Sequence, residues 1–284
     1  KKIEIEDYAK SLCTYLAMSV SKWADLSNNV CSWNNTNQNI RNLFARQAIP
    51  MNWDFAELSP FSNVGPWFST VESILKAMEN LSPKNYGCSF FSDAADFTVN
   101  LEPYICSTDP PYYDNIGYAD LSDFFYVWLR YSLKDFFPEL FKTLSVPKSQ
   151  ELVAAPYRHG GKDNAEKFFL EGMKKAMTRL SKTSHPAFPI TIYYAFKQSE
   201  TKTEFGTSST GWETFLQAVL NSGLSISGTW PIRTEREARS IGIGKNALAS
   251  SVVLVCCPRR QDAEKITRKE FQRELKQKLP NFLH

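Results

Sequence analysis

The pattern of hydrophobic and polar positions changes character near residue 88. Before this point, apolar side chains recur every three or four residues, the spacing that places them on one face of a helix. The segments with this spacing are 3–27, 37–47 and 69–80. Asparagine-rich and proline-containing stretches separate them and are typical of loops. The sequence therefore predicts an N-terminal helical segment over residues 1–50, followed by one further helix.

After residue 88, short runs of β-branched and aromatic residues alternate with helical patterns. The predicted strands are 89–94, 104–108, 188–196, 224–232 and 250–257. The predicted helices are 120–135, 163–181, 211–222 and 262–279. Strands that alternate with helices are typical of a parallel sheet covered by helices on both faces.

The last two predicted strands differ from this alternation, because the polar loop 233–249 between them contains no crossover helix. Strands joined in this way pair antiparallel, so we expect a hairpin at the end of the parallel sheet. The expected fold class is therefore α/β. The longest polar stretch, 197–210, predicts a loop or lid over one edge of the sheet.

Composition is that of an ordinary folded protein that can bury a core. Of its 284 residues, 43% are hydrophobic and 22% are charged, which excludes a disordered tail and a disulfide-stapled mini-protein. A net charge of +3 does not by itself indicate a nucleic-acid partner. The sequence has no apolar run near 18 residues and no charged-then-apolar leader, so we expect a cytoplasmic protein without a membrane span.

The six cysteines do not form a Cys-x-x-Cys pair, and only three histidines accompany them. A structural zinc site needs four such ligands at close spacing. The sequence therefore predicts reduced thiols and no metal site.

The residues Asp109, Pro110, Pro111 and Tyr112 directly follow the second predicted strand. Ligands of open α/β sheets bind outside the carboxyl ends of such strands. The prolines lack an N–H and fix φ, so they form a stiff loop with outward carbonyls. A carboxylate and a carbonyl accept two hydrogen bonds from one amino group, and a tyrosine ring stacks on a planar base. This combination suits the exocyclic amine of a base flipped out of its helix.

This motif resembles the Asp/Asn/Ser-Pro-Pro-Tyr/Phe signature of the methyltransferases that use S-adenosylmethionine to methylate amino groups. More narrowly, five ordered stretches resemble the large adenine-specific DNA methylases of prokaryotes. They are 53–61, 109–130, 151–160, 230–235 and 249–255. The resemblance implies a partial Rossmann-like methyltransferase sheet, with 51–284 as the catalytic portion, S-adenosylmethionine as cofactor and DNA as partner.

The same resemblance implies a role for individual residues. The catalytic residues are Asp109, Pro110, Pro111 and Tyr112. The cofactor-binding residues are Asp93, Ala94 and Asp109. The substrate-binding residues are Tyr113, Arg233, Arg236, Arg239, Lys245 and Asn246, of which the last five follow the end of a strand and would contact phosphates.

Several of these residues also have a purely structural interpretation. Asp93 suits a helix N-cap or a turn, Tyr113 suits the core, and acidic neighbours balance the cations of the 233–249 loop. We expect Asp120 and Asp123 to cap the following helix or to face solvent.

The sequence departs from the resembling family at the cofactor site. These enzymes grip the methionine part of the cofactor with a glycine-rich turn, but only Gly65 and Gly87 precede residue 88. The chain also begins without Met, so we expect it to be the later part of such an enzyme, with the turn upstream or on a partner chain. The expected activity is methylation of adenine N6 in DNA. The alternatives are methylation of RNA guanine, DNA cytosine N4 or protein glutamine, and a non-catalytic subunit with this fold.

Overall fold

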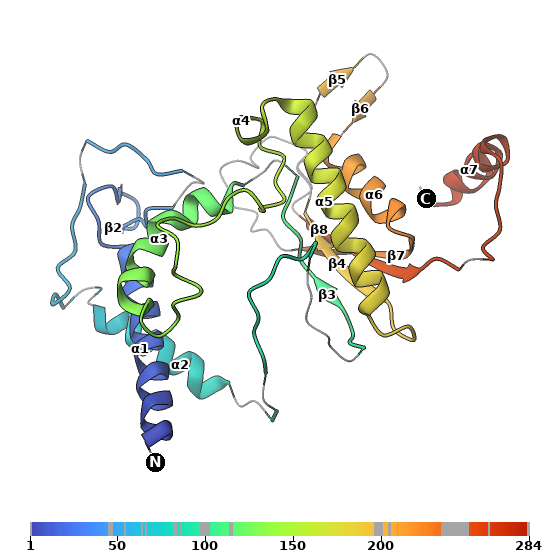
Figure 1. Ribbon diagram of the computed structural model, residues 1–284. Helices are drawn as coiled ribbons and strands as arrows, with labels where there is room; N and C mark the ends of the chain where they lie inside the picture. The colour runs from blue at the N-terminus through green and yellow to red at the C-terminus, as the bar shows by residue number, and fades with distance from the viewer. Residues whose placement is uncertain are drawn as a thin grey trace. The chain divides into compact units, whose positions relative to one another are not determined.

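Figure 1 shows the computed structural model of the chain. The structure describes residues 2–44, 48–53, 55–63, 65, 67–81, 84–85, 87–96, 103–113, 116–195, 201–203, 206–208, 210–233, 250–260 and 262–282. The chain forms two compact units. The first unit comprises Lys1–Phe97 and Pro111–Phe169, and the second comprises Thr98–Pro110 and Leu170–His284.

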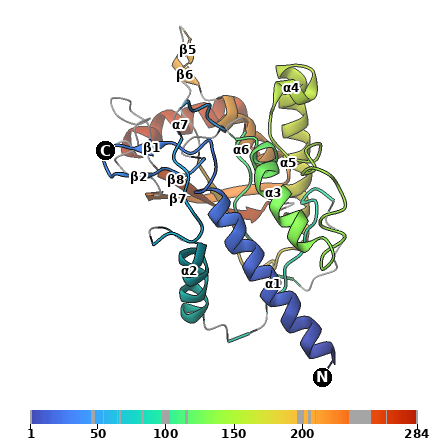
Figure 2. The same ribbon diagram turned by 90° about the vertical axis from the view of Figure 1, so that its left-hand side faces the viewer.

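The first unit is built mainly from helices. They are α1 (Lys2–Ala24), α2 (Trp67–Asn80), α3 (Tyr118–Leu133), the short α4 (Pro156–His159) and the first part of α5 (Lys162–Thr183). Helix α1 packs against both α2 and α3 (Figures 1 and 2). At the contact with α2, the Ser19 hydroxyl accepts a hydrogen bond from Trp67 Nε1 at 3.0 Å, and Thr70 Oγ1 donates to the Ser19 carbonyl at 3.2 Å. The helices predicted over 3–27 and 69–80 are confirmed.

The helix predicted over 37–47 is wrong for its described part. Strands β1 (Trp33–Asn34) and β2 (Asn39–Ile40) form an antiparallel hairpin there, whereas 45–47 lie outside the described residues. The Asn34 side-chain oxygen accepts hydrogen bonds from the Thr36 and Asn37 amides at 3.2 and 3.4 Å. Gln38 has a φ of 50°, which a helix does not allow. Asparagine turn chemistry therefore overrides the apolar spacing.

The second unit contains a four-stranded sheet in the order β3-β4-β8-β7. Its strands are β3 (Ser107–Thr108), β4 (Ile190–Tyr194), β8 (Ser250–Pro258) and β7 (Leu224–Arg233). Strands β3 and β4 are parallel, and β8 is antiparallel to both β4 and β7. The predicted antiparallel hairpin after parallel strands is therefore confirmed, and the protein is of mixed α/β class.

Alternating residues of β4 bury one face of this sheet. Ile190, Ile192 and Tyr194 are buried, and helix α6 (Thr210–Asn221) supplies Phe215, whose ring stacks on Tyr194 with centroids 3.9 Å apart. Two buried β-branched residues and two stacked rings give this face its hydrophobic stabilisation.

Two further predictions in these regions are wrong. Residues 89–94 form no strand, because Phe90 and Phe91 are exposed and this segment has no buried face. The 197–210 stretch is not an irregular loop, because β5 (Thr201–Thr203) and β6 (Gly206–Ser208) form a hairpin within it. Residues 196–200, 204, 205 and 209 lie outside the described residues, and the lid stays a prediction. Threonine is β-branched, which favours this pairing.

The C-terminal helix α7 (Arg268–Phe282) begins later than predicted. Thr267 and Glu270 form a reciprocal cap at its start, since Glu270 Oε2 accepts from the Thr267 amide at 2.7 Å and Thr267 Oγ1 accepts from the Glu270 amide at 3.2 Å. The hydrogen bond from the Thr267 amide lowers the pKa of Glu270. None of the described helices combines the length and apolar character needed to cross a membrane.

Candidate functional site

The first half of the motif lies at the carboxyl end of a parallel strand in the second unit. Thr108 ends β3 and is opposite Ile192 of β4. Just before this pair, the Thr191 amide donates to the Cys106 carbonyl at 3.1 Å. Asp109 follows the strand directly and is exposed, whereas the next residue, Pro110, is buried. The strand thus ends with a carboxylate that faces solvent, next to an anchored proline.

The second half of the motif belongs to the first unit. Pro111 and Tyr112 are half-buried, and Tyr113 is only 8% exposed. The Tyr113 ring packs edge-on against Phe169 with centroids 5.1 Å apart, and its carbonyl accepts a hydrogen bond from the Ala154 amide at 2.6 Å. Tyr113 therefore packs as a core residue, the structural interpretation of its sequence, and Tyr112 is the more accessible of the two tyrosines.

The predicted cofactor residues Asp93 and Ala94 lie in a turn of the first unit. Asp93 Oδ1 accepts from the Ala95 amide at 2.8 Å, and the Asp93 carbonyl accepts from the Asp96 amide at 3.1 Å. Asp93 is half-buried and Ala94 is exposed. The turn interpretation of Asp93 thus describes its local structure.

A charged cluster that the sequence did not predict lies at the start of α3. We call Asp120, Glu151, Tyr157 and Arg158 the Arg158 cluster. Arg158 donates to Glu151 Oε2 at 2.5 Å and to Asp120 Oδ2 at 2.6 Å, and its side chain is 10% exposed. The Tyr157 hydroxyl donates to the same Asp120 oxygen at 2.5 Å. One guanidinium thus holds two carboxylates that are distant in sequence.

The cap of α3 differs from the expected one. Glu151 Oε1 accepts from the Ala119 amide at 2.9 Å, so a carboxylate distant in sequence satisfies one of the free amides in the first turn of the helix. Asp123 accepts from the Val146 amide at 2.8 Å and from Lys148 Nζ at 2.7 Å. Asp120 and Asp123 face solvent in part, as expected, with side chains 41% and 38% exposed. They do not cap α3, because both bind other segments of the first unit.

The charges of the cluster shift its pKa values. The hydrogen bond from Tyr157, followed by the Arg158 guanidinium, lowers the pKa of Asp120, and the same bond raises the pKa of Tyr157. Burial acts to lower the pKa of Arg158, but hydrogen bonds to Glu151 and Asp120 outweigh it and raise the pKa. At neutral pH, Asp120 is therefore a carboxylate and Arg158 a cation, while Tyr157 keeps its proton.

Most of the predicted phosphate-binding residues lie outside the part of the chain that the structure describes. Arg233 is the last residue of β7, and only its backbone is described. Arg236, Arg239, Lys245 and Asn246 lie outside the described residues. Their contact with DNA stays a prediction.

All six cysteines are free thiols. Burial raises the pKa of Cys106 and, with the neighbouring Cys257, raises the pKa of Cys256 to about 11. Within the parts of the chain that the structure describes, His, Cys, Asp and Glu form no group of three that would hold a metal ion.

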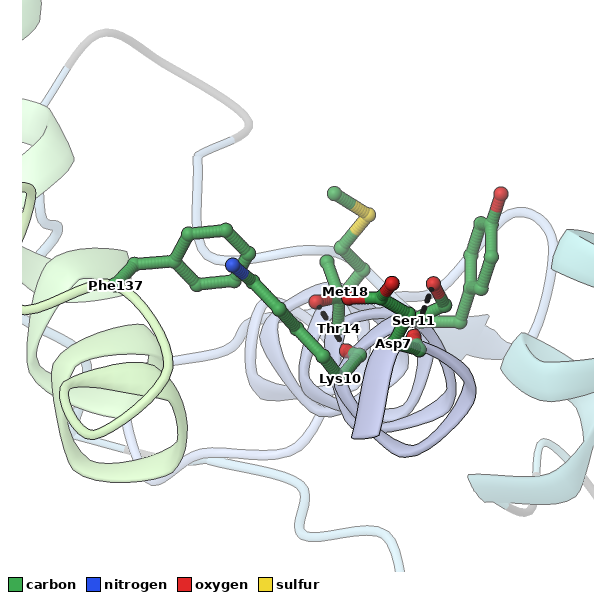
Figure 3. Close-up of a pocket in the computed structure, with 7 residues that line it drawn as sticks. Asp7, Lys10, Ser11, Thr14, Met18 and Phe137 are labelled. Atoms are coloured by element: carbon green, nitrogen blue, oxygen red, sulfur yellow. Dashed lines mark hydrogen bonds between the residues drawn. The ribbon is translucent and has the colours of Figure 1, made fainter. Parts of the chain in front are cut away.

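A shallow depression of about 450 Å³ lies on α1 and contains none of the motif residues (Figure 3). Lys10 extends over the Phe137 ring, with Nζ 4.4 Å from the ring centroid. Ser11 and Thr14 donate hydrogen bonds to carbonyls of their own helix. These polar groups are therefore used within the unit. The depression is lined by Asp7, Lys10, Ser11, Thr14, Tyr15, Met18 and Phe137.

The chain matches no protein-family model, no curated protein and no solved structure. The chemistry of the site rests on its own residues. These residues offer a solvent-facing carboxylate after a strand, a stiff proline pair and a half-buried aromatic ring.

Replacing Asp120 with asparagine is expected to lower the melting temperature by about 2 °C at pH 7, as for a partly exposed ion pair. The folded-state pKa of Asp120 lies below its ordinary value of 3.8, so its stabilisation is present above that value and is lost as the pH falls through the lowered pKa. Differential scanning calorimetry of the wild type and of Asp120→Asn should therefore show a difference in melting temperature that narrows below about pH 4.

The matched control is Asp135→Asn, at an exposed position just after α3. This variant should have nearly the melting temperature of the wild type both at pH 7 and below about pH 4. A difference between wild type and Asp120→Asn that stays constant down to pH 2 would contradict the assigned ion pair.

Proposed function

We propose that this chain carries the amine-binding part of a methyltransferase that acts on adenine N6 in DNA and uses S-adenosylmethionine. The observation that carries the proposal is the exposed Asp109 carboxylate directly after a parallel strand, followed by two prolines and Tyr112. Polar residues at the carboxyl ends of parallel strands commonly bind ligands. The sheet supports the proposal, because parallel strands followed by an antiparallel hairpin are what the resemblance implies.

In the proposed reaction, the Asp109 carboxylate and a proline carbonyl accept the two hydrogens of the adenine amine. These hydrogen bonds orient the amine and increase the electron density of its lone pair. The Tyr112 ring stacks on the base after it leaves the DNA helix. S-adenosylmethionine would supply the methyl group: a bond would form between N6 and the methyl carbon as the sulfur–methyl bond breaks, S-adenosylhomocysteine would leave, and the amine proton would pass to Asp109 or to water.

The described residues do not form a complete site for S-adenosylmethionine. Asp93 already accepts a hydrogen bond within its own turn, and the sequence has no glycine-rich turn to hold the methionine part. We therefore propose that an upstream segment or a partner chain completes the cofactor site. The basic loop 233–249 is proposed to contact DNA phosphates.

The test is transfer of a labelled methyl group to adenine-containing duplex DNA. The chain is assayed alone and together with the protein segment encoded immediately upstream. We expect N6-methyladenine only from the combination. If neither preparation binds S-adenosylmethionine in a calorimetric titration, the enzyme proposal is refuted and the non-catalytic subunit takes its place.

Replacing Tyr112 with alanine is expected to weaken binding of a flipped base by about 10- to 100-fold, since one base–aromatic stack contributes about 1–3 kcal/mol. Affinity for S-adenosylmethionine should change by less than about twofold, because stacking on the base is not a cofactor contact. Fluorescence titration with 2-aminopurine at the target position measures the first effect, and calorimetry measures the second.

Tyr112→Phe is the matched control, because it keeps the ring and removes only the hydroxyl. It should retain most of the base affinity. A larger loss of cofactor affinity than of base affinity in Tyr112→Ala would argue against the stacking role.

A further inference from the structure

The end of the motif is attached to a segment some forty residues further along the chain. The Tyr113 carbonyl accepts a 2.6 Å hydrogen bond from the Ala154 amide. The segment that supplies this amide is buried, with Val153, Ala154 and Ala155 only 2%, 3% and 7% exposed. Apolar burial and one short backbone hydrogen bond thus hold the motif at Tyr113.

The Arg158 cluster joins the same segment to the start of α3, on the other side of the motif's end. The Arg158 amide donates to the Ala155 carbonyl at 3.0 Å, so its side chain starts from the segment that holds Tyr113. Its guanidinium then reaches Asp120 at 2.6 Å in the first turn of α3. Glu151, which precedes the same segment, caps that turn through the Ala119 amide. The chain from Tyr113 to α3 is therefore held at both of its ends.

The backbone between these ends passes close to the cluster. A side chain at Gly117 would place its Cβ 3.0 Å from Asp120 Oδ2 and 3.4 Å from the nearer Arg158 nitrogen. The first distance is at the limit of ordinary contact, so glycine permits the close approach. The cluster thus lies directly against the link between motif and helix.

The charges make arginine difficult to replace. Two carboxylates share one guanidinium: the side chain of Glu151 is 13% exposed and that of Asp120 is 41% exposed. Without the guanidinium, the carboxylate of Glu151 would lose its cationic partner in a largely buried place. Lysine carries one point charge and no planar fork, so it cannot reproduce both pairs with the same geometry.

We infer that Arg158 is a positioning residue, which fixes the Pro111–Tyr113 end of the motif by tying Asp120 to Glu151. The inference rests on the proposed function, because it gives the Arg158 cluster a role in amine methylation. Arg158 itself touches no reacting atom: it acts through the backbone that carries Tyr112.

The test compares Arg158→Lys with Arg130→Lys in the complete enzyme. Arg130 is the matched control, because its Nε donates to the Phe141 and Thr143 carbonyls at 3.1 and 2.9 Å further along the same helix. Hydrogen exchange of the Ala154 and Ala119 amides should accelerate at least about tenfold in Arg158→Lys and stay unchanged in Arg130→Lys. In the same variant, kcat should fall between about 10- and 100-fold. The KM for S-adenosylmethionine should stay within about twofold of wild type.

The outcomes separate the two proposals. Unchanged exchange at Ala154 and Ala119 overturns the positioning role, whatever the activity. Faster exchange with an unchanged kcat also overturns it. A wild-type enzyme without methyl transfer refutes the proposed function instead. If Arg158→Lys does not fold, Glu151→Gln replaces it, since this variant keeps the shape of the cluster and should loosen the Ala119 amide.

Discussion

Asp109→Ala is expected to reduce methyl transfer by at least about 100-fold while leaving the fold intact. The carboxylate is exposed, so its loss should change the free energy of unfolding by less than about 0.5 kcal/mol. Alanine offers no acceptor, so one of the two amine hydrogens loses its partner in the proposed complex. Single-turnover transfer of labelled methyl to DNA, with urea denaturation of the same preparation, measures both effects.

Two matched variants sharpen this experiment. Asp109→Asn keeps one carbonyl acceptor at the same position, and should retain more activity than the alanine variant. Asp135→Ala removes another exposed aspartate and should leave transfer unchanged. Transfer near the wild-type rate in Asp109→Ala would remove Asp109 from the proposed mechanism, even if the chain proved to be a methyltransferase.

Short runs of β-branched residues in the sequence were sufficient to predict most strands of the four-stranded sheet. The β-branched runs that became β7 and β8 were predicted to within one residue at each end. They pair with each other over their whole length, and β8, which lies between β4 and β7, buries Val253, Leu254 and Cys256, so propensity and packing agree there. The 89–94 run has strand-like residues too, but its phenylalanines remain exposed and the Asp93 side chain closes a turn. Propensity without a partner strand did not form a strand there.

The candidate site was foreseeable only where it depends on local sequence. Asp109 follows a short strand and two prolines follow it, so its position at a strand end could be read from neighbouring residues. The Arg158 cluster joins Asp120 to Arg158 across 38 positions, and no periodicity connects charges that far apart. The sequence offered one signal for this cluster, a glutamate and an arginine seven positions apart at 151 and 158. This spacing does not indicate that the two side chains bind the start of α3.

Phe169→Ala is expected to lower the free energy of unfolding by about 3–5 kcal/mol, the usual cost of removing a fully buried phenylalanine. Phe169 is 0% exposed, and its ring meets the Tyr113 ring at 78° with centroids 5.1 Å apart. The variant removes apolar area and also leaves a cavity beside the motif. Urea denaturation followed by circular dichroism measures the loss, and Phe169→Leu should recover part of it.

The adjacent Phe168 provides the control for this last effect. Its ring is half-buried and stacks on His159 with centroids 4.1 Å apart, so Phe168→Ala removes the same atoms one position away. Phe168→Ala should lower the free energy of unfolding by a smaller amount, about 1–2 kcal/mol, because the half-buried Phe168 ring buries less apolar area. Equal losses at both positions would contradict the assignment of the larger cost to the fully buried Phe169, which contacts Tyr113.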